Sequence, residues 1–408
     1  MRKISLWDEF YRNLFLDRVE MLIEMRMSET VRLVVDDLGT PGLTDGDTFN
    51  FIWSEVGLND AGKGNTDNNN NNNQLTMKTK AFSPAIQSVC QKLNASLQKL
   101  LEELYEYVDS GTSNGKDQFS RIDPLAFLND QNGPSGRDSE PFSLTLDNET
   151  VLKFAQRTCI ESVGKMVAQV SERKGKANLI ELGRFYAAVS ELCPAIQKCV
   201  EAPLVTDGDK AVMRGVANFR GTPEWIEVKK VLEDESNRYF VLWIGQLVAS
   251  LKKDLSNFLT DNFGIDSLAE WDSSEICEEA EDGTQVRSVI RVPQYISVGL
   301  HSALAAFVHR AHLAGPHALP QSVQLSLTQD SAAVIIDAYL NYSEHRKLLQ
   351  NVALQLHFDV QFVMQCIVSR DNRSVSTLCA SALTSLEKHI DPFDLVSVQY
   401  SSYTFNFS

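Results

Sequence analysis

Apolar residues recur three and four positions apart along most of this chain, which is the period of an α-helix that buries one face. One such run occupies residues 86–107, where the apolar positions are Ile86, Val89, Leu93, Leu97, Leu100, Leu104 and Tyr107. Residues 151–172 predict a further helix, and the next apolar face consists of Leu179, Leu182, Phe185, Tyr186, Val189, Leu192, Ile196 and Cys199. We expect Leu182 and Phe185 to be core residues.

The first helical pattern carries an aromatic-rich stripe. Its apolar residues fall on one face at 100° per residue: Trp7, Phe10, Tyr11, Leu14, Phe15, Met21, Leu22 and Met25. We refer to these eight residues as the N-terminal stripe. Arg18 interrupts the stripe, so a polar contact is expected at that point.

Prolines divide the later patterns. Pro194 lies inside a helical pattern, where a proline kinks the helix or restarts it from its first turn. From Glu224 the pattern predicts a helix of about ten turns. Pro293 is expected to open another helix, which the turn at residues 315–320 ends. Three more helices are predicted, over residues 321–343, 345–369 and 374–389. Between the helix that begins at Glu224 and the one expected from Pro293, residues 286–292 favour a short extended segment. The fold class predicted is therefore all-α, built as an elongated rod of antiparallel helical bundles.

Two windows lack helical periodicity. Residues 40–80 are rich in Gly, Asp and Asn, with an unbroken run of asparagine from Asn68 to Asn73, and residues 110–146 are loop-like. Such segments bury too little apolar surface to offset their ordering entropy, so both are predicted to be disordered insertions.

The length predicts two modules. With 408 residues, of which 43% are hydrophobic, the chain can build two cores, because a single core stops growing well below this length. We expect a helical bundle over residues 1–203 that contains the two insertions, and a linker over 204–222. A second bundle is expected over 223–391, followed by a tail over 392–408.

Charge and cysteine usage indicate a cytosolic protein whose partners are proteins. The net charge of −16 disfavours nucleic acid and anionic membrane surfaces. No signal peptide is recognisable, and no stretch reaches the roughly eighteen apolar residues of a membrane span. The seven cysteines are odd in number and fall mostly at apolar helix positions, which predicts reduced, buried thiols.

Motifs that resemble catalytic loops lack their required context. The spacing of Gly57 to Lys63 matches a phosphate-binding loop, but Gly64 replaces the hydroxyl residue that would hold magnesium. Gly111 to Gly115 matches a nucleophile elbow around Ser113, but no strand precedes it. The pairs Asp45/Asp47 and Asp207/Asp209 lack the further oxygen ligands of a calcium loop.

Histidines and acidic residues offer weaker candidates. His301, His309, His312 and His317 permit a surface metal site by spacing alone, without a matching acidic or cysteine ligand. The acidic run Glu275, Glu278, Glu279, Glu281 and Asp282 reads as a solvated loop, and contact with a basic partner remains an alternative. We predict no catalytic, metal or cofactor site.

Four segments resemble a known family. They are Glu191-Leu-Cys-Pro-Ala-Ile-Gln-Lys-Cys-Val200, the region from Trp271 to Pro293, Gly315-Pro-His-Ala-Leu-Pro320 and Ile390-Asp-Pro-Phe-Asp-Leu395. In this order they resemble the C-terminal half of the subunit 1 family of the conserved oligomeric Golgi complex. The resemblance implies a non-enzymatic helical rod, peripheral on the cytosolic face of Golgi membranes, that assembles with the other subunits. It also implies a role in intra-Golgi retrograde transport and in the retention of Golgi glycosyltransferases. Contacts with SNAREs and Rab GTPases through the complex are also implied.

The same resemblance suggests a partner-binding surface. Family chains continue upstream, so helices that would cover the N-terminal stripe are absent from this chain. The candidate partner-binding residues are therefore Trp7, Phe10, Tyr11, Leu14 and Phe15. We expect the uncovered stripe to cause self-association that partner subunits suppress. Two alternatives remain open, a helical-rod subunit of another trafficking tether and an unrecognised enzyme.

Overall fold

The computed structural model describes most of the helical chain. The described residues are 11–38, 82–113, 142–172, 178–202, 221–259, 271–279, 285–315, 319–368, 372–392 and 394–395. They form two compact units, and the division falls between Tyr239 and Phe240, inside helix α8 (Pro223–Phe258). One continuous helix thus contributes residues to two cores. Most of the predicted linker, residues 204–220, lies outside the described residues, so that boundary stays a prediction.

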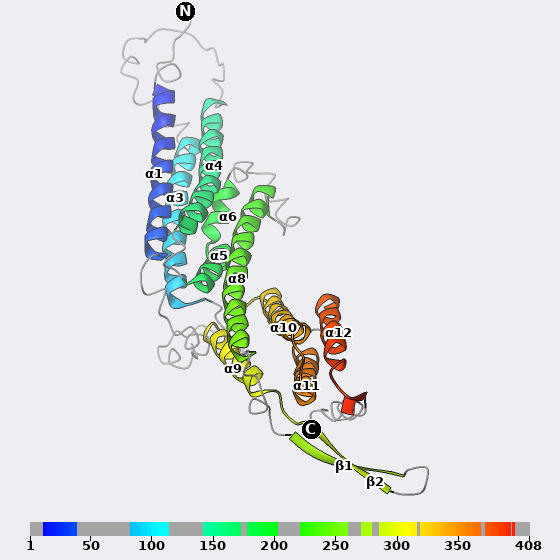
Figure 1. The fold of residues 1–408 in the computed structure, drawn as a ribbon. Helices are drawn as coiled ribbons and strands as arrows, with labels where there is room; N and C mark the ends of the chain where they lie inside the picture. The colour runs from blue at the N-terminus through cyan, green and yellow to red at the C-terminus, as the bar shows by residue number, and fades with distance from the viewer. Residues whose placement is uncertain are drawn as a thin grey trace, which may run out of the picture. The chain divides into compact units, whose positions relative to one another are not determined.

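Three long helices make up most of the described part of the first unit: α1 (Arg12–Leu38), α3 (Pro84–Ser113) and α4 (Phe142–Glu172). They lie side by side in Figure 1, where α1 packs against both α3 and α4. The inner face of α1 is buried at helical spacing by Ile23, Met27, Thr30, Val31, Val34, Val35 and Leu38. This face holds α1 in its bundle through apolar contact.

Polar contacts fix how α1 sits on its neighbours. Arg12 Nε donates to the nearly buried carboxylate of Asp147 on α4 at 2.7 Å. The hydroxyls of Thr30 and of Ser96 on α3 lie 2.6 Å apart. These contacts link α1 to both neighbours along its length.

Pro194 restarts the helix, which is one of the two outcomes expected from the sequence. Helix α5 (Leu179–Leu192) ends at Cys193, and α6 (Pro194–Val200) begins with proline in its first turn. The break releases the backbone N–H of Ala195, which donates to the Asn94 side chain on α3 at 3.0 Å. Both helices pack on α3, and α6 also contacts α4. The kink therefore lets one apolar pattern contact two helices.

The predicted core of α5 is confirmed. Leu182 is 3% exposed and Phe185 is fully buried. The Phe185 ring lies 5.4 Å from that of Tyr186, which in turn stacks on Tyr239 of α8 at 5.7 Å. Ser236 of α8 donates to the Gly183 carbonyl at 2.7 Å. This aromatic group joins the first part of α8 to the first unit.

Beyond the end of α8, the described part of the second unit contains four further helices and a β-hairpin. The helices are α9 (Val298–Leu313), α10 (Gln321–Glu344), α11 (Gln350–Cys366) and α12 (Arg373–Glu387). Helix α12 packs on α10 and α11. In Figure 1 these three helices lie close together, in orange to red.

Strands β1 (Trp271–Glu279) and β2 (Gln285–Pro293) form an antiparallel hairpin. Trp271 pairs with Pro293 and Glu279 with Gln285, so the strands are in register along their length. At the base, Trp271 and Val292 pack against Ala353, Leu354 and Ile390. Figure 1 shows the ribbon extending away from the helices. The extended segment predicted at 286–292 is confirmed. The prediction of a solvated loop is wrong for Glu275, Glu278 and Glu279, which belong to β1 because β2 pairs with them.

The start of α9 corrects the sequence prediction. Pro293 ends β2 instead of opening a helix, and α9 begins after Ser297, whose hydroxyl caps the Leu300 N–H at 3.4 Å. The cap lies where it does because Ser297 is bound to Asp359 of α11, a contact that local sequence does not encode. Gly299 then allows close approach, since a Cβ there would overlap the Phe258 ring.

The described residues are mainly α-helical, which confirms the predicted all-α class, with the hairpin as an addition. The two predicted insertions lie largely outside the described residues. The edges of the second window, residues 110–113 and 142–146, belong to α3 and α4. Most of the predicted tail, from residue 396 onward, also lies outside the described residues.

Candidate functional site

The outer face of α1 carries the described part of the N-terminal stripe. Leu14 is 66% exposed, Tyr11 58% and Phe15 39%, and the Phe15 ring contacts Tyr107 of α3 at 5.7 Å between centroids. The same face continues with exposed Met21, Leu22 and Met25. Trp7 and Phe10 lie outside the described residues. The structure thus brings Tyr11, Leu14 and Phe15 together on one exposed face.

Helix α1 is therefore apolar on two opposite sides. At 100° per residue, Tyr11, Leu22 and Met25 point away from the direction of Met27 and Val34, which face the bundle. A surface helix normally places polar residues opposite its core face. Contiguous exposed apolar residues mark interaction sites more often than isolated ones do. The outer face of α1 is the candidate functional site of the first unit.

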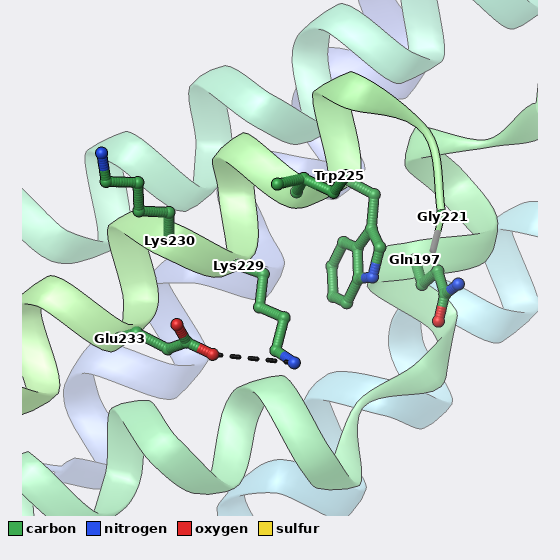
Figure 2. A pocket seen from close by; sticks show the side chains of 7 residues that line it. Gln197, Gly221, Trp225, Lys229, Lys230 and Glu233 are labelled. Atoms are coloured by element: carbon green, nitrogen blue, oxygen red, sulfur yellow. Dashed lines mark ion pairs between the residues drawn. The ribbon is translucent and has the colours of Figure 1, made fainter. Parts of the chain in front are cut away.

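A pocket of about 550 Å³ lies at the start of α8 (Figure 2). Figure 2 shows Lys229 turned toward Glu233, with 3.6 Å between their charged groups. Gly221 has a φ of 71°, and a Cβ there would overlap Trp225. Gln197 is also engaged, since its amide donates to the Glu201 carboxylate. Because these groups bond to one another within α6, α8 and the turn before α8, we assign the pocket no chemistry.

A buried carboxylate organises the second unit. Asp359 of α11 is fully buried and accepts hydrogen bonds from three residues. The donors are the backbone N–H of Ser297 at 2.8 Å, the Ser297 hydroxyl, the Tyr339 hydroxyl at 3.0 Å and the Gln355 amide at 3.2 Å. The contacts join the α9 cap, α10 and α11 at one point. These bonds hold the start of α9 against α10 and α11, which is a structural role.

Burial raises the pKa of Asp359 to about 6, and the hydrogen bonds from its neighbours act in the opposite direction. The carboxylate is therefore ionised at neutral pH. Burial lowers the pKa of the nearby His357, and the Glu387 carboxylate partly offsets this lowering. His357 is therefore neutral at neutral pH. These two groups make the stability of this unit depend on pH with opposite signs.

We expect Asp359 to contribute more stability in mild acid than at neutral pH. Between the unfolded pKa, near 3.8, and the folded pKa of about 6, the folded state retains a proton that the unfolded chain has released. The contribution is fully present below this window and falls by up to about 1.4 kcal/mol per pH unit as pH rises through it. Urea unfolding of wild type and Asp359→Asn at pH 4.5, 5.5 and 7 measures it. A difference in unfolding free energy between the two proteins that is constant with pH would contradict the expectation. Because both proteins contain His357, its effect cancels in this difference.

The thiols are placed as the sequence predicted, with one exception. Cys90, Cys159, Cys193, Cys199 and Cys379 are buried, whereas Cys366 is exposed and the side chain of Cys277 is not described. The Cys193 thiol donates to the Cys90 carbonyl at 3.4 Å. Contact with the Cys90 thiol and burial together raise the pKa of Cys193. Protonated thiols of this kind are inert.

The remaining motifs do not assemble into sites. Ser113 ends helix α3, so no strand leads into it, and Gly57 to Lys63, Asp45/Asp47 and Asp207/Asp209 lie outside the described residues. His301, His309 and His312 are exposed on α9, and His317 is not described. Glu275, Glu278 and Glu279 belong to β1. Among the described residues, no three potential metal ligands come together.

Sequence reasoning missed the polar centre around Asp359. Its signal was a charged residue flanked by buried apolar positions of α11, between Phe358 and Val360.

Within the described part of the chain, no helix is both long enough and apolar enough to cross a bilayer.

Comparison with known proteins supports the resemblance carried by the four segments. The chain is 24% identical over 448 aligned residues to conserved oligomeric Golgi complex subunit 1 of Homo sapiens, which covers 97% of this chain and 46% of that protein. It is 26% identical to the subunit of Mus musculus, with 97% and 45% covered. Identity to the Drosophila melanogaster subunit is 23%, over 79% of this chain and 33% of the relative. The chain spans about half the length of the mammalian relatives. No family model and no solved structure matches it.

Proposed function

We propose that this chain acts as a subunit of the conserved oligomeric Golgi complex and binds other proteins without catalysing a reaction. The observation that carries the proposal is the similarity to subunit 1 of that complex over nearly the whole chain. The relatives are named as subunits of an assembly, and binding surfaces are what such a subunit requires.

The outer face of α1 supports this role. It exposes large apolar side chains on a helix whose other face is already buried in its own bundle. Burial of apolar surface contributes about 25 cal/mol of free energy per Å², so such a face is a source of affinity for a partner. In this proposal the chain works through helix faces, on the cytosolic side of Golgi membranes, and reaches the membrane through its partners. SNAREs and Rab GTPases would contact it through the assembled complex.

Affinity purification of the tagged chain from cells is expected to recover the other subunits of the conserved oligomeric Golgi complex. Mass spectrometry of the recovered proteins is the measurement, and the same purification from cells with the untagged chain is the control. Recovery of the subunits of a different trafficking tether would contradict the assignment and favour the alternative complex. Recovery of no trafficking subunit, together with saturable turnover of a substrate, would favour the enzyme alternative.

A further inference from the structure

The outer face of α1 has the spacing of a coiled-coil seam. Tyr11, Leu14, Arg18, Met21 and Met25 follow one another at intervals of three, four, three and four residues, and all five are exposed. This alternation of three and four places residues along the line where one helix packs against another. We call these five residues the α1 seam.

The geometry of the seam suits a single helix as its occupant. Its five positions extend over 15 residues of one helix, which is about 22 Å at 1.5 Å per residue. Phe15 and Leu22, each directly after a seam position, widen the apolar surface on one flank. Figure 1 shows α1 at the margin of its unit, with α3 and α4 on its other side.

Arg18 occupies the middle of the seam and defines the chemistry of the partner. Its guanidinium contacts the Met21 sulfur at 3.8 Å, and within the described residues it forms no ion pair. A guanidinium covered by a docked helix requires an anion, because a buried unpaired charge is costly. A polar residue at one core position also specifies the register of a helix pair. The facing helix must therefore place a carboxylate opposite Arg18.

The position of Arg18 argues against a second copy of this chain as the occupant, and so against the self-association that the uncovered stripe led us to expect. Arg18 is the central residue of the seam, with two apolar seam positions on each side. A symmetric pair of α1 seams, parallel in register or antiparallel, brings Arg18 against the same residue of the other copy. Like charges facing each other across an interface are destabilising and select against that partner.

We propose that the α1 seam binds one amphipathic helix of a different protein chain, which carries a single Asp or Glu at the core position that faces Arg18. This inference rests on the proposed function, since it names the partner chemistry of the same face. The two apolar positions on each side supply affinity, and the central ion pair sets register and partner choice.

Synthetic helices test the partner chemistry directly. The probes are three labelled peptides with leucine at every core position except the central one, which is Glu, Lys or Leu. Fluorescence anisotropy with the full chain is expected to show the Glu peptide binding at least about tenfold more tightly than the Lys peptide. In Arg18→Glu this preference should invert. Equal binding of the Glu and Lys peptides, or a preference that Arg18→Glu leaves unchanged, would overturn the proposal.

Two variants locate the binding on α1. Leu14→Glu combined with Met21→Glu is expected to abolish binding of all three peptides, because both residues are exposed seam positions. Val241→Glu is the control, since it places a glutamate at an exposed apolar position of α8 and should leave binding unchanged. Thermal melts establish that each variant is folded. Binding that survives in the folded double variant would overturn the proposal.

Measuring self-association tests whether a second copy of this chain occupies the seam. Sedimentation equilibrium is expected to show Arg18→Leu associating at least about tenfold more tightly than wild type, because the substitution removes the like-charge contact. If wild type forms a dimer that the double variant abolishes and Arg18→Leu does not strengthen, the seam is a homodimer contact and the proposal is wrong. The outcomes separate from those of the proposed function. Golgi subunits recovered without a charge preference reject only the seam proposal, and a charge preference without Golgi subunits rejects only the function.

Discussion

Asp359→Ala is expected to lower the free energy of unfolding of the second unit by about 3 kcal/mol or more, since each buried donor left without an acceptor costs roughly 1–3 kcal/mol. The change removes the acceptor of Ser297, Tyr339 and Gln355 together. Relief from burying the carboxylate offsets part of this cost, which is why the expected loss is below the sum of the separate bonds.

Urea unfolding at pH 7, combined with hydrogen exchange of the amides of α9, α10 and α11, measures this effect. Exchange should accelerate first at Ser297, because its N–H loses the bond that sets the start of α9. Asp359→Asn is the matched variant, since it keeps the shape and one acceptor oxygen, and it should cost less than alanine. A loss below about 1 kcal/mol for Asp359→Ala would mean that the network contributes no more than one ordinary hydrogen bond.

Phe185→Ala is expected to destabilise the first unit by about 3–5 kcal/mol, the range for removing a large buried aromatic side chain. Phe185 is fully buried on α5, and its ring supports Tyr186 and, through that ring, Tyr239 of α8. The cavity would therefore open where α5 meets the first part of α8.

Denaturant unfolding followed by the exchange of α4 and α5 amides measures the loss. Leu14→Ala is the control, because Leu14 is exposed on α1 and should change stability by no more than about 0.5 kcal/mol. Equal losses in the free energy of unfolding for the two substitutions would contradict the expectation that the buried Phe185 stabilises the unit more than the exposed Leu14. An effect of Phe185→Ala confined to α9–α12 would contradict its placement in the first unit.

Much of the helical architecture was predictable from local pattern. The spacing of apolar residues located α3, α5 and α8, and Pro194 marked the restart between α5 and α6. Phe185 and Leu182 were recognisable as core residues because they lie on one strongly apolar face. These features depend on interactions within a few turns, so they are written in contiguous sequence.

The candidate site was only partly predictable. Tyr11, Leu14 and Phe15 were identified as an apolar stripe, and the structure leaves them exposed. The inner face of α1, which includes Met27 and Val34, was not recognised, although it is the face that packs. A helix with two apolar faces has no internal property that selects one, and the choice depends on what α3 and α4 offer.

Long-range pairing decided the remaining features. Strand β1 exists because β2 pairs with it residue by residue, and no apolar alternation in its acidic sequence announced it. The start of α9 at Ser297 follows from a bond to Asp359, 62 residues away in the chain. The sequence by itself determined where helices form, since helix formation depends on residues three and four apart. Only the tertiary structure decided which face of α1 is buried, where α9 begins and which carboxylate is enclosed, because each depends on a surface contributed by a distant segment.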